Sequence, residues 1–304
     1  MTLALTGATG FVGQAVLDEA QARGLSIRAL ARRPQPPRKG VIWIEGSLTD
    51  PAPLAALAES ARAVLHVAAL TTAPDAASFT LANVAGTAAL LDAAKAAGAR
   101  RFIFVSSLAA REPELSLYGA SKAEGEKLVA GSGLDWTVVR PPGVYGPRDV
   151  DYLEMFRTAR LGFVPLPPRG ASSILHVLDL ARLLLDLVDA PSALARHKLF
   201  EPDDGREGGW SHAELAQAIG QAVGRSRVFA PHLPAPLLRA AAHIDSAIRG
   251  AKARLTADRA SYMMHPNWVA RSAFAVPKPV WEPRIAAEDG LAQTAAWYRR
   301  QGWL

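Results

Sequence analysis

The first half of the chain alternates short aliphatic runs with alanine-rich stretches of helical length. Strands that alternate with helices of this length form βαβ units, in which successive strands lie parallel in one sheet. Several runs are apolar almost throughout, as expected for strands covered on both faces. We therefore predict an α/β domain with strands at Thr2–Leu5, Ser26–Leu30, Val41–Ile44, Ala63–Val67, Arg101–Val105 and Trp136–Val139. Helices between them are predicted at Phe11–Arg23, Pro53–Ala61, Phe79–Ala97 and Ser121–Ala130.

After Gly146 this pattern changes. Prolines crowd Val164–Pro168, and the later helical stretches are no longer separated by long apolar strands. We predict that residues 1–146 form the sheet domain. Residues 147–304 are expected to form most of a smaller, mostly helical lobe that binds substrate, with some segments returning to the sheet domain. Helices of this half are predicted at Leu178–Asp189, His212–Val223, Pro236–Ile248 and Ile285–Arg299.

The composition narrows the chemistry that such a fold can carry. The chain has 304 residues, half of them apolar, and no cysteine, which excludes disulfides, thiolate metal ligands and cysteine nucleophiles. The histidines are dispersed without metal-ligand spacing, so no metal site is expected. No secretion signal and no uncharged apolar run of membrane length is visible, which predicts a soluble, cytoplasmic protein without membrane insertion.

The net charge of +6 could attract anionic partners, including cofactor phosphates, nucleotide-linked substrates, nucleic acid or a membrane. The lysines and arginines are scattered, however, and never form a dense run. Nucleic-acid-binding proteins usually concentrate their charge in a patch or stripe. We therefore favour an ordinary arginine-rich surface, and we expect a small-molecule substrate and no nucleic-acid partner.

A glycine-rich segment, Thr6–Gly13, follows the first predicted strand and leads into the first helix. Gly7 permits a tight turn, Gly10 lets the backbone approach a pyrophosphate, and Gly13 lets helix and strand pack closely. The helix N-terminus presents N–H groups and the positive end of its dipole to the phosphates. Strand, glycine turn and helix together predict a Rossmann-type dinucleotide site.

The end of the second strand bears on the choice between NAD and NADP. An NAD site typically ends this strand with an acid that accepts a hydrogen bond from the ribose 2′-hydroxyl. Here the strand leads into Arg32 and Arg33, whose guanidinium groups can pair with a 2′-phosphate. The two arginines could instead belong to a solvated loop with Arg38 and Lys39. We predict NADP(H) as the preferred cofactor, with NAD(H) as the alternative.

Tyr118 and Lys122 are four residues apart where a helix is predicted to begin, so their side chains share one face. A nearby ammonium favours the phenolate form of a tyrosine. Tyr118 could then exchange a proton with a substrate hydroxyl or carbonyl while a nicotinamide carries hydride. Ser107 follows the fifth strand, at the edge where parallel sheets bind ligands, and its hydroxyl can donate to the same substrate oxygen.

These motifs, in this order, resemble the extended short-chain dehydrogenase/reductase family, which includes the NAD-dependent epimerases and dehydratases. The resemblance covers nearly the whole chain and is carried by Thr6–Gly13, Leu65–Ala69, Asn83–Thr87, Val105–Ser107, Tyr118–Lys122, Arg140–Asp149 and Trp297–Trp303. It implies that Tyr118 is the general acid/base and that Lys122 supports it and binds the nicotinamide ribose. It also implies that Ser107, in preference to Ser106, orients the substrate oxygen.

The resemblance further implies where the cofactor is held. Ala68 would line the cofactor site, and Pro141 and Val144 would lie beside the nicotinamide. Asn83 would lie near the active site or fix the helix before it, and we favour the structural role. The expected catalytic residues are thus Ser107, Tyr118 and Lys122, and the expected cofactor-binding residues are Gly7, Thr9, Gly10, Phe11, Val12, Gly13, Arg32, Arg33, Ser47, Leu48, Ala68, Lys122, Pro141 and Val144.

Two features depart from the family pattern. Ser107 and Tyr118 are only 11 residues apart, a shorter gap than in sugar-nucleotide epimerases. The short gap is similar to an atypical branch that includes the large NADPH-binding accessory subunit of respiratory complex I. After the third strand the chain has Gly46, Ser47 and Leu48, where the family usually places an aspartate that reaches the adenine. The Ser47 hydroxyl or the backbone would have to serve instead.

We therefore predict an NADP(H)-dependent oxidoreductase or epimerase-type enzyme that moves hydride between nicotinamide and a secondary alcohol or ketone carbon. The substrate could be a nucleotide sugar. The alternative is a cofactor-binding structural or assembly protein, like the complex I subunit, in which NADPH would hold the fold together. By analogy with family dimers, a homodimer through Phe79–Ala97 and Ser121–Ala130 is a further expectation.

Other candidates are open to two interpretations. His176 could contact substrate or be a buried or helix-capping histidine. Asp179 is expected to cap the helix that follows it. Arg111, Arg148 and Arg157 could steer an anionic substrate, although each is more often a surface charge.

Overall fold

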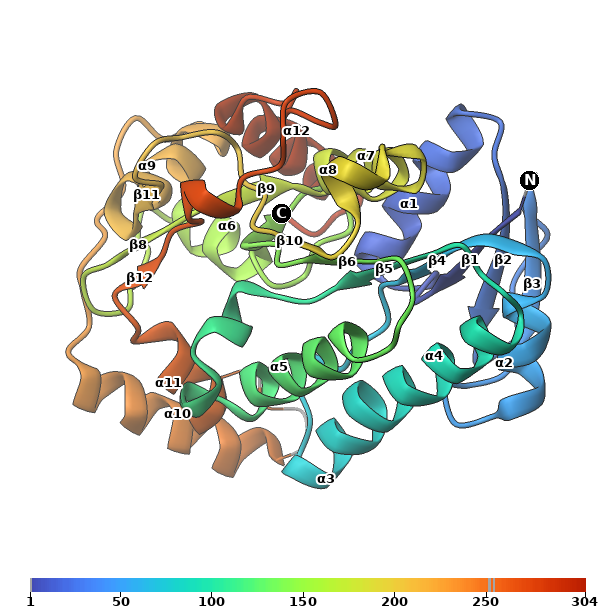
Figure 1. Cartoon of the computed structure of the whole chain (residues 1–304). Helices are drawn as coiled ribbons and strands as arrows, with labels where there is room; N and C mark the ends of the chain where they lie inside the picture. Colours follow the sequence, from blue (N-terminus) through green and yellow to red (C-terminus); the bar gives the residue numbers. More distant parts are fainter. Residues whose placement is uncertain (1, 251–252, 254) are drawn as a thin grey trace. The chain divides into compact units, whose positions relative to one another are not determined.

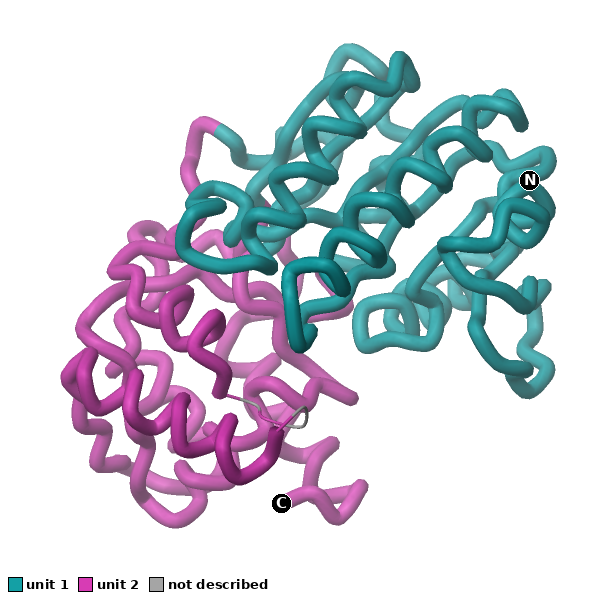
Figure 2. Tube along the Cα trace, turned by 90° about the horizontal axis from the view of Figure 1, so that it is seen from below, with its two compact units in different colours: residues 1–141, 180–201, 274–282 teal, residues 142–179, 202–273, 283–304 magenta. Residues whose placement is uncertain are grey.

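A computed structural model describes residues 2–250, 253 and 255–304. The chain divides into two compact units, which Figure 2 shows in different colours. Unit 1 comprises Met1–Pro141, Leu180–Glu201 and Phe274–Glu282, and unit 2 comprises Pro142–Asp179, Pro202–Ala273 and Pro283–Leu304. Each unit is therefore assembled from segments that lie far apart in the sequence.

Among the described residues, unit 1 contains a seven-stranded sheet in the order β10-β6-β5-β4-β1-β2-β3, and every neighbouring pair is parallel. The predicted α/β fold, a parallel sheet covered on both faces, is confirmed, and its strand order is that of a doubly wound sheet. The strands are β1 (Thr2–Thr6), β2 (Ser26–Ala31), β3 (Val41–Glu45), β4 (Ala61–His66), β5 (Arg101–Val105), β6 (Trp136–Val139) and β10 (Lys198–Phe200). The first six lie where the apolar runs predicted them, whereas β10 was not predicted.

Helices cover both faces of this sheet (Figure 1). On one face lie α2 (Pro51–Ala58), α4 (Gly86–Ala96) and α5 (Leu117–Ala130), and on the other lie α1 (Phe11–Ala22) and α7 (Val177–Asp189). Leu54, Leu90 and Val129 pack with Val64 and Phe102 in the core of the first face. The Arg23 guanidinium, just after α1, pairs with Asp186 of α7 at 2.6 Å. Shorter segments of unit 1 are α3 (Ala76–Phe79), α8 (Ser192–Ala195) and the 3₁₀ turns η2 (Leu108–Arg111) and η3 (Pro113–Leu115).

The predicted helix Phe79–Ala97 is in fact composite. It begins as α3, continues through a π-helical segment, η1 (Thr80–Ala85), and ends as α4. A π-helical turn adds a residue per turn and is frequent at functional sites. The structure also corrects the helix predicted at Pro53–Ala61, because α2 begins at Pro51, ends at Ala58, and Ala61 already belongs to β4.

Unit 2 is mostly helical around its own core. Its helices are α6 (Leu153–Arg160), α9 (His212–Ala222), α10 (Ala235–Arg249), α11 (Ala257–Met263) and α12 (Ala287–Arg300), and its short strands are β7 (Gly143–Tyr145), β8 (Ala171–Ser172), β9 (Ile174–His176), β11 (Trp210–Ser211) and β12 (Asn267–Trp268). Phe156, Ile219, Leu291 and Tyr298 are fully buried in this core. None of the helices described is long and apolar enough to cross a membrane.

Asp179 does not have the predicted capping role. It lies in the first turn of α7, and its carboxylate accepts hydrogen bonds of 3.0 Å from the backbone N–H groups of Arg284 and Ile285. The buried carboxylate therefore ties α7 to the segment before α12. The contact joins residues more than a hundred positions apart, so the local pattern around Asp179 could not reveal it.

Candidate active site

The glycine turn between β1 and α1 has two positions at which a side chain does not fit. Gly7 has a φ of +72°, and a Cβ atom there would lie 2.7 Å from the backbone nitrogen of Ala68. A Cβ atom at Gly13 would overlap the carbonyl oxygen of Gly7. Because Gly7 and Gly13 lack side chains, the start of α1 packs closely against the turn and Ala68 lies beside it.

The N-terminus of α1 is suited to an anion. Within this fully described helix, no side chain caps the first turn and no acidic residue lies in it. A Cβ atom built on Gly10 would have a single neighbour within 4 Å, the carbonyl oxygen of Gly7 at 3.3 Å. The backbone therefore fits the pyrophosphate of a dinucleotide, which Gly10, Phe11 and Val12 could hold through N–H groups at the positive end of the helix dipole.

Two guanidinium groups gather beside this turn, in a pocket of about 380 Å³ at the end of β2. The pocket is lined by Thr9, Arg32, Arg33 and Gln35, and none of these is acidic. Arg32 and Arg33 are exposed, whereas Arg38 donates to Asp18 at 2.7 Å and to Gln14 at 3.2 Å. Arg38 is thus committed to α1, and the arginine pair is available to a phosphate group. Gln35 was missed in the sequence because a lone glutamine in a proline-rich loop carries no motif.

The buried imidazole ring of His66 is hydrogen-bonded to Thr6, the residue before Gly7 of the glycine turn. Thr6 Oγ1 lies 2.7 Å from His66 Nδ1, and the other ring nitrogen of His66 lies 2.9 Å from Thr87 Oγ1. Burial, and secondarily the charge of Lys122, lowers the pKa of His66 to about 3. The ring is therefore neutral at physiological pH and acts as a fixed hydrogen-bonding link from β1 through β4 to α4. Thr6 Oγ1 also accepts from the N–H of Ala68 at 3.2 Å.

The segment after β3 forms a hydrogen-bonded loop around Ser47. The N–H of Ser47 donates to the carboxylate of Asp50 at 2.8 Å, and the Ser47 hydroxyl lies 2.7 Å from that of Thr49. Hydrogen bonding to Ser47 lowers the pKa of Asp50. Leu48 packs on α4, where a Cβ atom at Gly86 would lie 2.9 Å from its side chain. The loop thus holds a carboxylate three residues beyond the position at which the family pattern expects one.

The two serines after β5 have different environments. Ser106 is buried and donates a 2.5 Å hydrogen bond to Glu126, whose carboxylate forms a two-pronged ion pair with Arg140 at 2.8 and 2.6 Å. Ser107 is partly exposed, and its hydroxyl oxygen accepts from the N–H of Ala109 at 3.1 Å. Ser106 therefore belongs to a structural network, whereas the hydroxyl hydrogen of Ser107 is available to a substrate oxygen.

Tyr118 lies in the first turn of α5, which packs directly on the turn that Ser107 caps. A Cβ atom at Gly119 would lie 2.7 Å from the carbonyl oxygen of Ala109, so the two backbones approach closely there. Ser116 caps α5 by accepting from the N–H of Gly119 at 2.9 Å. The phenol ring is partly exposed and lies 6.3 Å from the ring of Phe79. The structure thus brings the segments of Ser107 and Tyr118 together.

Lys122 lies one turn further along α5 and is fully buried. Its Nζ atom donates to the carbonyl oxygen of Val105 at 2.6 Å and lies 4.3 Å from the centre of the Phe104 ring. Burial lowers the pKa of Lys122 to about 7, while the carboxylate of Glu126 opposes the shift. The Nζ atom of Lys122 can reach Val105 because α5 packs closely on β5. A Cβ atom at Gly125 would lie only 2.9 Å from the Phe104 ring.

Two further residues hold α5 in place; the structural role of Asn83 was predicted, whereas Glu126 was not. Glu126 continues the four-residue spacing of Tyr118 and Lys122 on the same face of α5. Asn83 donates to Ser121 Oγ at 2.9 Å and exchanges two hydrogen bonds with the backbone of Leu70, at 2.7 and 2.9 Å. Asn83 thereby ties the π-helical segment to α5 and to the loop after β4. These contacts favour the structural role for Asn83.

The remaining predicted residues are placed as follows. Pro141 is buried in unit 1, and its carbonyl oxygen accepts from the N–H of Leu108 at 3.1 Å. Val144 lies on β7 in unit 2, so its place beside a nicotinamide stays a prediction. His176 is buried on β9 beside Tyr145, with ring centres 5.3 Å apart, and its Nδ1 accepts from the N–H of Leu178 at 3.3 Å. His176 therefore caps the start of α7.

Of the three arginines considered for steering an anionic substrate, two form ion pairs and one has a strained backbone conformation. Arg111 is paired with the buried Glu201 at 3.5 Å in unit 1, and Arg157 is paired with Glu154 at 2.8 Å on α6. Arg148 adopts a left-handed backbone conformation with a φ of +77°. Arg111 and Arg157 therefore have structural roles, each within its own unit.

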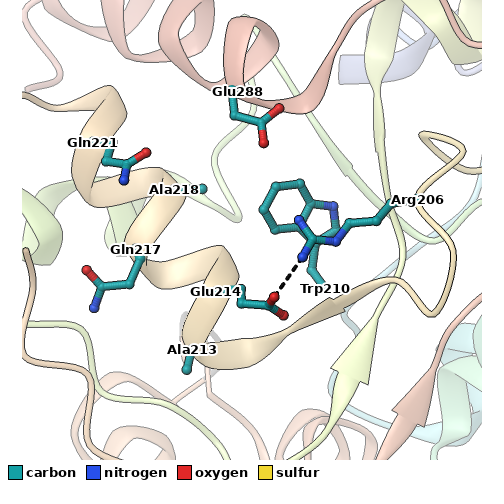
Figure 3. A pocket seen from close by; sticks show the side chains of 8 residues that line it. All are labelled: Arg206, Trp210, Ala213, Glu214, Gln217, Ala218, Gln221 and Glu288. Atoms are coloured by element: carbon teal, nitrogen blue, oxygen red, sulfur yellow. Dashed lines mark hydrogen bonds and ion pairs between the residues drawn. The ribbon is translucent and has the colours of Figure 1, made fainter.

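A second pocket, of about 370 Å³, lies in unit 2 over α9 (Figure 3). The guanidinium group of Arg206 stacks on the ring of Trp210 at 3.9 Å and pairs with Glu214 at 2.7 Å. The indole N–H of Trp210 donates to Asp204 at 2.7 Å. Glu214 also completes the capping box of α9 with Ser211. The side chains of Asp204, Arg206, Trp210 and Glu214 are thus engaged with one another.

Comparisons with known proteins identify the family of this chain. Residues 7–191 match a family model described as NAD(P)H-binding. A ceramide reductase from Caulobacter vibrioides is 36% identical, over 99% of this chain and 96% of that protein. A 4-hydroxy-2-methyl-3-oxo-4-farnesyl-3,4-dihydroquinoline-1-oxide ketoreductase from Stigmatella aurantiaca is 32% identical over 60% of this chain and 62% of that protein.

Solved structures show the same fold. The crystal structure of gox2253 has a TM-score of 0.79 and 26% identity, and the match covers 100% of this chain and 99% of that one. UDP-glucose 4-epimerase from Thermotoga maritima, solved with UDP-glucose, has a TM-score of 0.73 and 20% identity, covering 99% of both chains. The predicted family is thereby confirmed: this chain belongs to the NAD(P)H-binding short-chain dehydrogenase/reductase family of the epimerase/dehydratase type.

Proposed function

We propose that this protein is an NADP(H)-dependent reductase of a ketone on a molecule that carries a long hydrocarbon chain. The observation that carries the proposal is the close packing of the turn that Ser107 caps against the first turn of α5, which contains Tyr118. Among the reductases similar to this chain, the names of two, a ceramide reductase and a ketoreductase of a farnesyl-bearing compound, refer to long-chain molecules. They support reduction over epimerisation and a lipid-like substrate over a nucleotide sugar.

The pocket at the end of β2 supports NADP(H) over NAD(H). Arg32 and Arg33 line it without an acidic residue, and Thr9 connects it to the glycine turn. Charge-assisted hydrogen bonds from two guanidinium groups suit the dianionic 2′-phosphate that distinguishes NADP from NAD. An acid would be expected here if the ribose 2′-hydroxyl were the group recognised.

Tyr118, Ser107 and Lys122 have separate roles in the proton transfer. When bound, the nicotinamide supplies the hydride that reduces the carbonyl carbon. Tyr118 donates a proton to the carbonyl oxygen, and Ser107 donates a hydrogen bond to the same oxygen and so polarises the carbonyl group. Lys122 lies one helical turn from Tyr118, and in its charged form it favours the phenolate that remains after proton transfer.

The test is a hydride-transfer assay with the purified protein and NADPH deuterated at the transferable position. The substrates are long-chain ketones and, in parallel, nucleotide sugars. We expect NADPH oxidation with the long-chain ketones and one deuterium on the carbinol carbon of each product, as read by mass spectrometry. Epimerisation of a nucleotide sugar without net NADPH oxidation would contradict the proposal. Bound NADPH that is never oxidised by any substrate would instead favour the non-catalytic assembly role.

A further inference from the structure

Helix α10 of unit 2 carries an exposed apolar face. Leu237, Ile244 and Ile248 are 57%, 59% and 76% exposed, which is unusual for large aliphatic side chains. They are spaced seven and four residues apart, so they project from the same side of the helix. Ala240 and Ala247, also exposed, widen this face. The outer face of α10 is therefore a continuous apolar stripe of helical length.

The opposite side of α10 has its own packing. Leu238 and Ala242 are buried against Ala260 of α11 in a small cluster separate from the main core of unit 2. Leu255, Met263 and Met264 pack around this cluster. In Figure 1 the two helices lie beside each other. Because the inner face accounts for the packing of α10 within unit 2, the apolar outer face has no role in the fold that the described contacts reveal.

The charges of α10 favour an anionic partner. The helix contains Arg239 and Arg249, and its one acidic residue is Asp245. Asp245 is turned away from the apolar face, since it accepts from the N–H of Leu255 at 2.9 Å and pairs with Arg249 at 3.1 Å. His243 is exposed on the flank. On one flank the apolar stripe is bordered by Arg239 and His243, whereas Arg249 lies with Asp245 toward the packed side of this fully described helix.

We propose that the outer face of α10 lies on the surface of an anionic lipid bilayer, with Leu237, Ile244 and Ile248 among the acyl chains and Arg239 at the headgroups. An apolar stripe bordered by basic residues is the pattern of helices that lie in the interfacial plane. The long side chain of Arg239 can extend along the helix and keep its charge at the headgroups. A helix of 15 residues is about 22 Å long, which suits lying on a bilayer and is too short to cross it.

The choice of a bilayer rests on the proposed function. A ketone with long hydrocarbon chains is dissolved in a membrane and is scarce in water, because each buried methylene group favours the bilayer. An enzyme that reduces such a ketone must meet it at the membrane surface. The interfacial helix would hold the protein where its substrate is concentrated.

The experiment is co-sedimentation of the full chain with vesicles, which needs no turnover. The vesicles contain phosphatidylcholine alone or phosphatidylcholine with about 30% phosphatidylglycerol, an anionic lipid whose negative surface potential attracts basic residues. The variant is the double substitution Ile244→Gln with Ile248→Gln, since glutamine is a better helix former than isoleucine. The matched control is Leu161→Gln, because Leu161 is 76% exposed, as Ile248 is, but lies outside α10. A third variant, Arg239→Gln, tests the charge.

We expect wild type and Leu161→Gln to bind the anionic vesicles, and the double variant to bind at least about tenfold more weakly, because two aliphatic side chains are lost from the acyl region. Arg239→Gln should weaken binding to anionic vesicles and leave binding to neutral ones unchanged. Equal binding by wild type and the double variant, or no binding by wild type, would overturn the proposal. A wild-type dimer that the double variant loses, with no vesicle binding, would assign this face to a second copy and overturn it too.

Failure of this proposal is separable from failure of the proposed function. The vesicle assay reports on α10 whatever the protein catalyses. Turnover of a short-chain, water-soluble ketone reports on the reaction whatever α10 binds. If α10 serves lipid access, the double variant loses activity on vesicle-embedded ketone and keeps its turnover of the soluble ketone.

Discussion

Lys122 donates a 2.6 Å hydrogen bond to the carbonyl oxygen of Val105, and this bond joins the tyrosine-bearing helix α5 to the end of β5. The ammonium group is buried, so its pKa is lowered to about 7. The charge beside Tyr118 therefore changes within the physiological pH range. The same residue couples the chemistry of the site to the stability of the fold.

Stability should rise with pH because of Lys122. In the unfolded chain the lysine keeps its proton up to its ordinary pKa of 10.5, whereas in the folded chain it loses the proton from about pH 7 upward. Between these values the unfolded state binds more protons, so the free energy of unfolding increases with pH. Urea unfolding at pH 7 and pH 9 should show this increase in the wild type and a smaller one in Lys122→Met. Lys127→Met, at an exposed lysine on α5, is the control and should behave as wild type.

Cofactor preference should depend on the arginine pair. The double substitution Arg32→Ala with Arg33→Ala should weaken NADPH binding at least about tenfold, because charge-assisted hydrogen bonds to the 2′-phosphate are lost. NADH binding should change little, since NADH lacks that phosphate. Isothermal titration calorimetry measures both affinities, and Lys39→Ala, an exposed neighbour outside the pocket, serves as the control. Equal losses for NADPH and NADH would refute a 2′-phosphate site.

The two serines after β5 should respond in opposite ways. Ser107→Ala should lower kcat by about tenfold or more, because a hydrogen bond to the developing oxyanion is lost, and should leave the melting temperature nearly unchanged. Ser106→Ala should cost about 1–3 kcal/mol of stability, because Glu126 loses a buried partner, while kcat per folded molecule is kept. Thermal unfolding and steady-state kinetics on both variants decide the assignment. If Ser106→Ala alone abolished turnover, the roles would be reversed.

The parts of the fold that depend on local pattern were predictable. The strands β1 to β6 lie where continuous apolar runs predict them. The glycine turn lies between β1 and α1, as its glycine spacing predicts. β10 escaped prediction because it is only Lys198–Phe200, and its partner β6 ends some sixty residues earlier in the chain. The helix α6 escaped for a related reason, since it is only eight residues long. Short elements are defined by tertiary contacts that local periodicity does not contain.

The candidate site, like the fold, was predictable where it depends on local motifs and not where it depends on tertiary contacts. Ser107, Tyr118 and Lys122 stand in recognisable order, and the structure brings the Ser107 turn against α5. The sequence did not reveal that Lys122 reaches back to Val105, because burial of its ammonium depends on how closely Gly125 lets α5 approach β5. Nor did it reveal Asp50, whose hydrogen bond with Ser47 depends on the turn between β3 and α2. Both hydrogen bonds depend on tertiary packing, which the sequence motifs do not describe.

The most direct test of Tyr118 as the proton donor in an NADPH-dependent ketone reductase is the kcat of Tyr118→Phe, measured as product alcohol formed per NADPH oxidised. The substitution removes one hydroxyl and keeps the ring beside Phe79. We expect kcat to fall by about 10²–10⁴-fold, as for loss of a general acid, with NADPH affinity and melting temperature nearly unchanged. Turnover by Tyr118→Phe at the wild-type rate would contradict the proposed role of Tyr118.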